Sequence, residues 1–203
     1  MSTDPQIEFF FDIASPYSYL ASTQIDKLED ETGVPVVWKP FLLGGVMKAT
    51  GNEPPARVQP KAAYMLEDIN RWADRYAIPF EMPAQFPLDS LTTQRALVAA
   101  REREDGAVST LAPELFEAYW AEGRHVSDPD VIADVADEAG FDGRELADAT
   151  GEDAIKAKLQ ELSDEAVDRG AFGAPTFFVG DEMFWGNDRL DFVRKAAGRN
   201  TRS

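Results

Sequence analysis

The sequence predicts an α/β domain in which one small sheet is interrupted by a long all-helical insertion. Three observations predict it. A strand–helix–strand pattern opens the chain, helical periodicity without strand-like alternation fills the middle, and a strand–strand–helix pattern closes the chain. The 203 residues are enough for one domain with such an insertion, and the 44% hydrophobic content is enough for a core. We therefore expect strands from both ends of the chain to share one sheet.

The beginning of the chain is typical of a βαβ unit. Residues 7–13 (IEFFFDI) are mostly β-branched or aromatic, which favours a buried strand. A helix is predicted from Pro16 to about Thr32, and Gly33 supplies a normal helix stop. Residues 34–41 (VPVVWKPF) again have the composition of a strand. Because a helical crossover joins the two strands, we expect them to be parallel.

Ser15 stands directly before the first predicted helix. Pro16 suits the first helical position, and proline disfavours the helical conformation for the residue that precedes it. Ser15 is therefore predicted to be the N-cap, with its Oγ near the first free backbone amides. A helix N-terminus also attracts negative charge. This stretch alone leaves open whether the hydroxyl only caps the helix or also holds an anion.

The middle of the chain is predicted to be a loop followed by helices. Residues 42–60 form a loop rich in glycine and proline that carries two cations, Lys48 and Arg57. Apolar residues spaced by three or four positions predict an amphipathic helix over residues 61–77, and residues 78–88 are predicted to be extended. Residues 90–170 read as helices separated by glycines.

The end of the chain returns to mixed structure. Residues 176–179 and 183–185 flank the turn Gly180-Asp181-Glu182, which predicts a β-hairpin. Asn187 is predicted to cap a final helix, with Asp188 in its first turn.

The whole order of elements fits a thioredoxin-type sheet with a helical insertion. We therefore assign residues 1–55 and 171–203 to a thioredoxin-like domain, and residues 56–170 to a helical insertion domain. No internal repeat or low-complexity segment interrupts either part.

The composition restricts the chemistry that the chain can carry by itself. There is no cysteine, which excludes disulfides, thiolate metal ligands and dithiol redox chemistry. Any sulfur chemistry must therefore come from a ligand. The single histidine, His125, lies in a polar turn and is interpreted as a solvated loop residue, so no metal site is expected.

The charge restricts the partners. The 37 acidic residues exceed the 20 lysines and arginines by a formal charge of −17, which repels phosphate backbones and anionic lipids. Neither nucleic acid nor a membrane is an expected partner. No apolar run is long enough to span a membrane, and the N-terminus MSTDPQ lacks the features of a secretion signal. We expect a cytoplasmic protein.

Five motifs in a fixed order carry a family resemblance. They are SPYSYL from Ser15, GVMKATGNEPP from Gly45, YMLEDINRWADRYAIPF from Tyr64, GAFGAPTFFV from Gly170 and FWGNDRL from Phe184. With them the chain resembles the kappa-class glutathione transferases and the 2-hydroxychromene-2-carboxylate isomerases, which have DsbA-like thioredoxin folds. Where DsbA-like proteins open the first helix with Cys-x-x-Cys, this chain has two serines, Ser15 and Ser18.

The resemblance implies a glutathione site, or one for the related thiol γ-glutamylcysteine, without a metal. In this family the serine that matches Ser15 holds the sulfur, and a hydroxyl donor at a helix N-terminus lowers the pKa of a thiol. Ala174, before a proline expected to be cis, offers its backbone to the cysteinyl part, and the segment that begins at Trp185 holds the γ-glutamyl end. The implied cofactor-binding residues are Ser15, Pro16, Tyr17, Ala174, Pro175, Trp185, Asn187 and Asp188, with Ser15 as the catalytic residue.

The resemblance also implies the reaction. An isomerase of this kind converts an aromatic acid between its cis and trans forms through reversible addition of the glutathione thiolate. Two alternatives stay open: a kappa-like transferase or peroxidase that consumes the thiol against electrophiles or hydroperoxides, and a thioredoxin-fold binding protein without chemistry. Members of the family tend to form homodimers.

Four residues are candidates for substrate binding, namely Lys48, Asn52, Arg57 and Phe86. The two cations suit a carboxylate clamp, because an acidic protein that binds an anionic substrate needs local positive charge. Phe86 suits an aromatic wall. The isomerase pattern has a lysine at the position that we align with Met47, so the chain departs from the pattern there.

The dispersed acidic residues and the scarcity of lysine suggest the surface of a halophilic protein, where salt screens the self-repulsion of the chain. We expect the unfolding temperature to rise markedly as KCl is raised into the molar range. Thermal unfolding followed by circular dichroism measures this shift, and melting that does not depend on salt contradicts the hypothesis.

Overall fold

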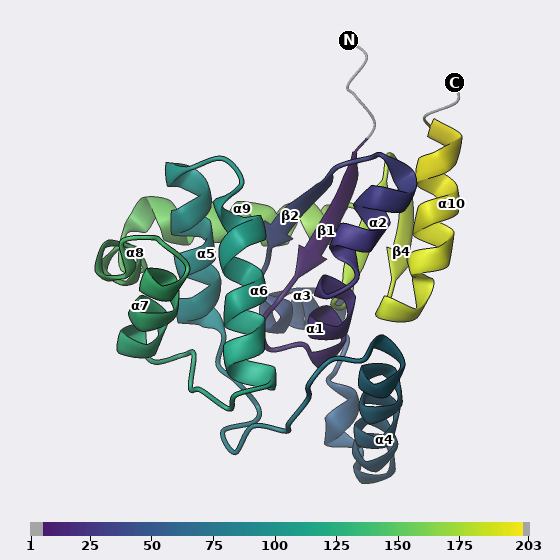
Figure 1. The fold of residues 1–203 in the computed structure, drawn as a ribbon, viewed down its shortest axis with the longest axis horizontal. Helices are drawn as coiled ribbons and strands as arrows, with labels where there is room; N and C mark the ends of the chain where they lie inside the picture. Colours follow the sequence, from purple (N-terminus) through teal and green to yellow (C-terminus); the bar gives the residue numbers. More distant parts are fainter. Residues whose placement is uncertain (1–5, 201–203) are drawn as a thin grey trace.

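The computed structural model describes residues 6–200 of the chain. Its centre is a four-stranded mixed sheet in the order β2-β1-β3-β4, built from both ends of the chain as expected (Figure 1). β1 (Ile7–Phe11) runs parallel to β2 (Val36–Pro40) and antiparallel to β3 (Thr176–Val179). β3 forms the predicted hairpin with β4 (Glu182–Trp185).

Helices cover both faces of the sheet and extend to one side of it (Figure 1). The predicted helical middle of the chain is confirmed, and none of its helices within residues 6–200 is long and apolar enough to cross a membrane. The helices are α1 (Pro16–Ser22), α2 (Ile25–Thr32), α3 (Leu43–Thr50), α4 (Gln59–Tyr76), α5 (Leu91–Arg103), α6 (Ala107–Trp120), α7 (Pro129–Glu138), α8 (Gly143–Ala149), α9 (Asp153–Asp168) and α10 (Leu190–Asn200), with the short 3-10 turns η1 (Pro55–Arg57) and η2 (Asn187–Arg189).

Aromatic side chains of β1 form the centre of the core on both faces of the sheet. Because side chains alternate along a strand, Phe9 and Phe11 lie on one face and Phe10 on the other. Phe9 stacks on Phe177 of β3 with the ring centroids 4.8 Å apart. On the opposite face, Phe10 meets Phe178 at 5.6 Å and packs with residues of α3 and α9. All five strand residues of β1 are buried, so it is the central strand of the fold.

The single helix predicted from Pro16 to Thr32 is wrong, because the chain breaks between α1 and α2. The hydroxyls of Ser22 and Thr23 donate to the carbonyls of Tyr19 and Leu20, three residues earlier. Such local bonds compete with the regular helical pattern and favour an interruption. The break lets α1 and α2 take different directions over the sheet (Figure 1).

The loop predicted over residues 42–60 is also partly wrong, since it contains α3 and η1. Two glycines in the first turn of α3 hid the helix, because glycine is a poor helix former. A side chain distant in sequence helps it to begin: Asp12 Oδ2 accepts a hydrogen bond of 2.8 Å from the Leu43 amide. The helix predicted over residues 61–77 is confirmed as α4.

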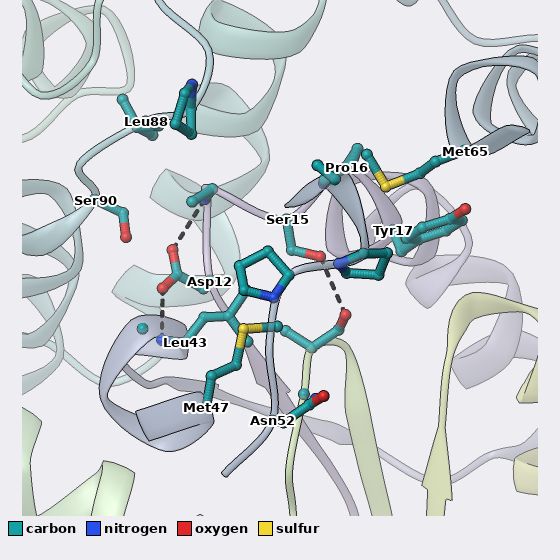
Figure 2. Close-up of a pocket in the computed structure, with 18 of the residues that line it drawn as sticks. Asp12, Ser15, Pro16, Tyr17, Leu43, Met47, Asn52, Met65, Leu88 and Ser90 are labelled. Atoms are coloured by element: carbon teal, nitrogen blue, oxygen red, sulfur yellow. Dashed lines mark hydrogen bonds between the residues drawn. The ribbon is translucent and has the colours of Figure 1, made fainter. Parts of the chain in front are cut away.

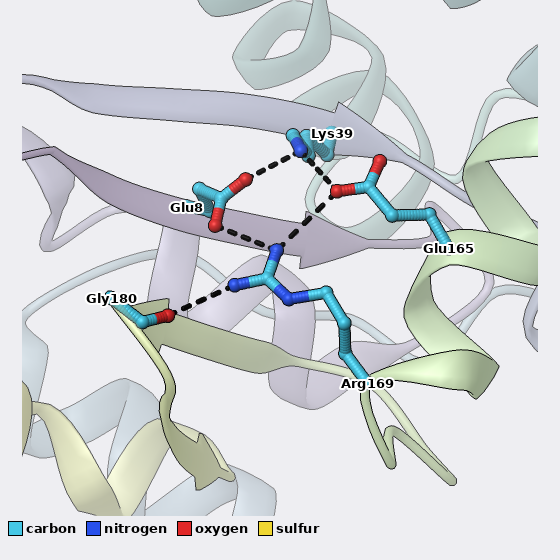
Figure 3. A network of polar contacts seen from close by, with 5 residues as sticks. All are labelled: Glu8, Lys39, Glu165, Arg169 and Gly180. Carbon is cyan, nitrogen blue, oxygen red and sulfur yellow. Dashed lines mark hydrogen bonds and ion pairs between the residues drawn. The ribbon is translucent and has the colours of Figure 1, made fainter. Parts of the chain in front are cut away.

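A nearly buried ionic network fastens the end of α9 to the sheet (Figure 3). Lys39 of β2 contacts Glu8 of β1 and lies 2.6 Å from Glu165 of α9. Arg169 lies 2.7 Å from Glu8, donates to the Gly180 carbonyl at 3.1 Å, and covers the ring of Phe178. Burial raises the pKa of the Glu8 carboxyl, but the hydrogen bonds from Lys39 and Arg169 outweigh it and hold this pKa below its usual value. The charged form of Glu8 therefore stabilises the fold.

Glu8→Gln should destabilise the protein by about 1–3 kcal/mol, because the buried Lys39 and the partly buried Arg169 each lose one of their two carboxylate partners. The contribution of Glu8 is complete above its unfolded-state pKa, near 4.5, and is lost as the pH falls through the lower pKa of the folded state. Urea unfolding at neutral and acidic pH measures both effects.

The matched control is Glu67→Gln, which breaks the exposed pair of Glu67 with Arg71. It should change stability by about 0.5 kcal/mol or less. If the two variants were equally stable, the network would not be the fastening that we describe.

Candidate functional site

A cavity of about 890 Å³ opens at the end of the sheet where α1 begins. Its walls come from both ends of the chain and from the insertion: the β1–α1 connection, the start of α3, α4, the segment that leads into α5, and the hairpin with η2 (Figure 2). The sequence places these segments far apart, and the fold brings five of them to one point.

Ser15 lies at the bottom of this cavity and is 4% exposed. It is the N-cap of α1, as predicted, with extended backbone angles, and its Oγ accepts a hydrogen bond of 3.2 Å from the Ser18 amide. The same hydroxyl donates to the Ala174 carbonyl at 3.1 Å (Figure 2). Ser15 therefore joins the first helix to the segment before β3.

The Ala174–Pro175 peptide is cis, which confirms the prediction for Pro175. Ala174 lines the cavity beside Ser15, whereas Pro175 is not among the lining residues. A second cis peptide, Phe86–Pro87, occurs in the wall before α5. Phe86 lines the cavity and packs against Trp120 at a centroid distance of 6.1 Å.

The residues after β4 form the wall beside Ser15. Trp185, Asn187 and Asp188 line the cavity, but the prediction that Asn187 caps the final helix is wrong. Gly186 takes the cap position of η2 with φ of 108°, and Asn187 is the first residue of this turn. Asn187 is 3% exposed, and its side chain interacts with the Tyr76 hydroxyl of α4, whose pKa it lowers against the effect of burial. This contact fixes the amide of Asn187 at the edge of the cavity, where it also faces a ligand.

A glycine is required where the wall approaches most closely. A Cβ at Gly173 would come within 2.7 Å of the Trp185 indole nitrogen. The Trp185 ring also contacts Phe172, with centroids 4.8 Å apart. The segment before the cis proline can therefore reach the hairpin only with glycine at this position.

Tyr17 and Asn52 support the opening of the cavity. The Tyr17 hydroxyl donates to Asp68 of α4 at 3.0 Å, and burial together with Asp68 raises the pKa of Tyr17 far above its usual value, so it stays protonated. Asn52 donates through Nδ2 to the Phe172 carbonyl at 2.8 Å. Both residues line the cavity, as does Pro16.

The two predicted cations do not line the cavity. Lys48 is exposed on α3, and Arg57 points to solvent, where it pairs with Glu53 at 2.9 Å. Among the lining residues of the described chain, the one cation is Arg189, which pairs with Asp188. The role of Lys48 and Arg57 in substrate binding stays a prediction. Arg189 belongs to the motif FWGNDRL, where nothing in the sequence distinguishes it from a surface arginine.

Sequence reasoning missed the buried polar pair of Asp12 and Ser90. Asp12 is 0% exposed, accepts hydrogen bonds from the Ala14 and Leu43 amides, and is also bonded by the Ser90 hydroxyl. Burial raises the pKa of the Asp12 carboxyl, and the nearby Asp89 adds to the effect. The sequence signal for this pair is an aspartate at the end of an apolar strand. Apart from Ala14, the partners of Asp12 lie 31 residues or more away along the chain, so the sequence alone does not predict these contacts.

His125 lies outside the cavity, exposed in its turn as predicted, beside Ser127. No group of three or more metal-ligating side chains occurs in the part of the chain that the structure describes. The chemistry of the cavity therefore has to be read from hydroxyls, amides, carboxylates and apolar surface.

Asp12→Asn should destabilise the fold by about 1–3 kcal/mol, because an amide nitrogen would face one of the two backbone amides that the carboxylate now accepts. Asp105→Asn, in an exposed turn, makes the same chemical change as a control and should be nearly neutral. Urea unfolding at neutral pH compares the two variants. Equal midpoints would mean that Asp12 does not anchor α3.

Comparison with known proteins places the chain. A model of the DSBA-like thioredoxin domain matches residues 6–198. The chain is 34% identical over 189 residues to a 2-hydroxychromene-2-carboxylate isomerase of Sphingobium xenophagum, with 92% of this chain and 95% of that protein covered. It is 31% identical over 200 residues to glutathione S-transferase kappa 2 of Caenorhabditis elegans, with 92% and 89% covered.

Solved structures agree with the sequence relatives. A structure of a 2-hydroxychromene-2-carboxylate isomerase superposes with a TM-score of 0.87 at 31% identity, over 97% of this chain and 96% of that chain. These named relatives are enzymes, so the reading as a binding protein without chemistry is set aside. The chain is an enzyme of the DSBA-like thioredoxin family, in the group that contains the 2-hydroxychromene-2-carboxylate isomerases and the kappa-class glutathione transferases.

Proposed function

We propose that this enzyme binds glutathione, or γ-glutamylcysteine, as a thiolate at Ser15 and uses it for the cis-trans isomerisation of a conjugated aromatic substrate. The observation that carries the proposal is the Ser15 hydroxyl, which is buried at the start of α1 and donates directly to the Ala174 carbonyl at the cavity wall. No cysteine competes for this position, and serine cannot form a mixed disulfide with the thiol.

The residues around Ser15 fit a γ-glutamyl thiol. Ala174 presents its backbone beside Ser15, as an extended cysteinyl unit needs. The amide of Asn187 can donate to the γ-glutamyl carboxylate, and Asp188 can accept from its ammonium group. We call the part of the cavity lined by Ser15, Tyr17, Ala174, Trp185, Asn187 and Asp188 the thiol half.

When bound, glutathione supplies a nucleophilic sulfur that adds to a conjugated double bond and leaves again after rotation. The chain's own contribution is to hold that sulfur as an anion. The Ser15 hydroxyl can turn from Ala174 to donate to it, and the first amides of α1 add positive potential. The protonated Tyr17 and the side chain of Trp185 flank the site and limit the access of water.

A kappa-like transferase or peroxidase is the second candidate. One observation favours it: Arg189 is the single cation among the described lining residues, and it is paired, so the clamp expected for an aromatic acid is not formed by the lining. The two activities differ in the fate of the thiol. Total thiol stays constant during isomerisation and falls in proportion to product during transfer or peroxide reduction.

A cytoplasmic location, a homodimer and a place in the breakdown of aromatic compounds remain predictions from the resemblance and the composition. A sedimentation measurement in high salt tests the dimer directly.

The test of the proposed function is Ser15→Ala with glutathione titrated over pH. In the wild type, the ultraviolet absorbance of the thiolate should show that the bound thiol has a pKa lowered toward neutrality. Activity should rise with pH through that pKa, because the deprotonated sulfur is the reactive form. In Ser15→Ala the pKa should return toward that of a free thiol, about 8.5, with a loss of about 1 kcal/mol in stability from the missing cap.

Ser18→Ala is the matched control in the same helix. Its hydroxyl is buried, has no hydrogen-bond partner within residues 6–200, and does not line the cavity. This variant should leave the thiol pKa and the activity unchanged. Activity that survives Ser15→Ala unaltered, or a thiol pKa that does not move, rules out the proposed role of Ser15.

A further inference from the structure

The cavity continues beyond the thiol half into a region that has a different character. Its walls are apolar side chains from the start of α3 and from the segment before α5 (Figure 2). We call this region the distal half; it is lined by Leu42, Leu43, Met47, Phe86, Leu88 and Leu91, with Asp12, Asp89 and Ser90 as its polar residues. The distal half is where a substrate beside the thiol has to lie.

The polar residues of the distal half are two carboxyl groups and one hydroxyl that faces one of them. Asp12 is fully buried, and the Ser90 hydroxyl is turned toward it (Figure 2). Asp89 stands close enough to raise the pKa of Asp12. An anionic substrate placed here would therefore meet two carboxyl groups and no cation among the described lining residues of the distal half.

The helix ends in this region each have one first-turn amide that is bonded to a carboxylate of the chain. Two helices, α3 and α5, begin at the distal half, and a free helix N-terminus could attract an anion. Each of these two is already bonded to a carboxylate of the chain. The Leu43 amide donates to Asp12, and the Leu91 amide donates to Asp89 at 3.2 Å.

The three cations considered for substrate binding do not reach the distal half. Lys48 is exposed and outside the lining, Arg57 pairs with Glu53, and Arg189 pairs with Asp188 in the thiol half. A basic side chain at position 47 would point into the cavity, but this position is occupied by Met47, whose thioether points from α3 toward the centre of the cavity (Figure 2).

We propose that the distal half selects an uncharged, conjugated aromatic carbonyl compound, such as an arylidene ketone, against the corresponding carboxylate, and that Met47 is the specificity-determining residue. The reaction assigned to such a compound rests on the proposed function. The binding preference does not, because it depends only on the walls of the distal half.

The binding test uses two unreactive compounds that differ by one group. Benzylacetone ends in a methyl ketone, and benzylpyruvate has a carboxylate in place of that methyl. Quenching of tryptophan fluorescence, without any thiol, should give a dissociation constant at least about tenfold lower for benzylacetone. Met47→Lys should lower the dissociation constant of benzylpyruvate by about tenfold or more and change that of benzylacetone by no more than a few-fold. Met47→Leu keeps the apolar wall and should retain the wild-type preference.

Lys48→Met decides between this inference and a carboxylate clamp formed by Lys48. The inference expects the weak binding of benzylpyruvate to be unchanged in this variant. Equal or tighter binding of benzylpyruvate by the wild type, or its loss in Lys48→Met, overturns the proposal.

The unsaturated pair extends the test to turnover. With glutathione present, cis-benzylideneacetone should be converted to its trans isomer with a kcat/KM at least about tenfold higher than that for cis-benzylidenepyruvate, and Met47→Lys should narrow or reverse this ratio. A wild type that prefers benzylidenepyruvate overturns the inference while the role of Ser15 stands. If no thiolate is detected at Ser15 but the preference for the ketone is still observed, the proposed function is contradicted and the inference about the distal half stands.

Discussion

Two buried side chains satisfy the backbone at the point where β1 and β2 leave the sheet, and the site depends on them. Gln94 of α5 donates through Nε2 to the carbonyls of Phe11 and Phe41, both at 2.9 Å, and its Oε1 lies 3.4 Å from the Ile13 amide. Asp12 takes the next two amides, those of Ala14 and Leu43. Without these partners, buried peptide groups would be left unpaired, at a cost of about 1–3 kcal/mol each. These hydrogen bonds from Gln94 and Asp12 fix the position of the β1–α1 connection.

This arrangement explains why the helical segment and the sheet share one core. Gln94 and Trp120 belong to the helical middle of the chain, and the Trp120 indole donates to the Ile13 carbonyl at 2.9 Å. The connection between β1 and Ser15 is therefore built with side chains from α5 and α6. The ionic network of Glu8, Lys39, Glu165 and Arg169 adds a second attachment on the other face, through the end of α9. Whether residues 56–170 also behave as a separate domain stays a prediction, because shared contacts do not measure independent folding.

The sequence predicted the features that depend on near neighbours. The strands follow from composition, and the cap at Ser15 follows from the proline after it. The features that it did not predict depend on partners distant along the chain: α3 begins where Asp12 meets it, 31 residues away, and Gln94 acts across 83 and 53 residues. The cis peptide before Pro175 was predicted from the family resemblance, since the residue types around it allow either form. The direction of side chains could not be predicted from the sequence either. Arg189 lines the cavity, whereas the expected cations Lys48 and Arg57 do not.

The charge of the protein sharpens the question of how it can hold a thiolate at all. A chain with a formal charge of −17 has few cations to spare, and the described lining of the cavity has only Arg189, already paired. An anion in such a protein has to be stabilised by dipoles, because hydrogen-bond donors and helix N-termini provide local positive potential without a charged side chain. Within α1 the Ser18 amide is bonded to the Ser15 hydroxyl and not to a carboxylate, whereas the first amides of α3 and α5 are bonded to Asp12 and Asp89. The same distribution that lets Ser15 hold one anion therefore disfavours a second one beside it.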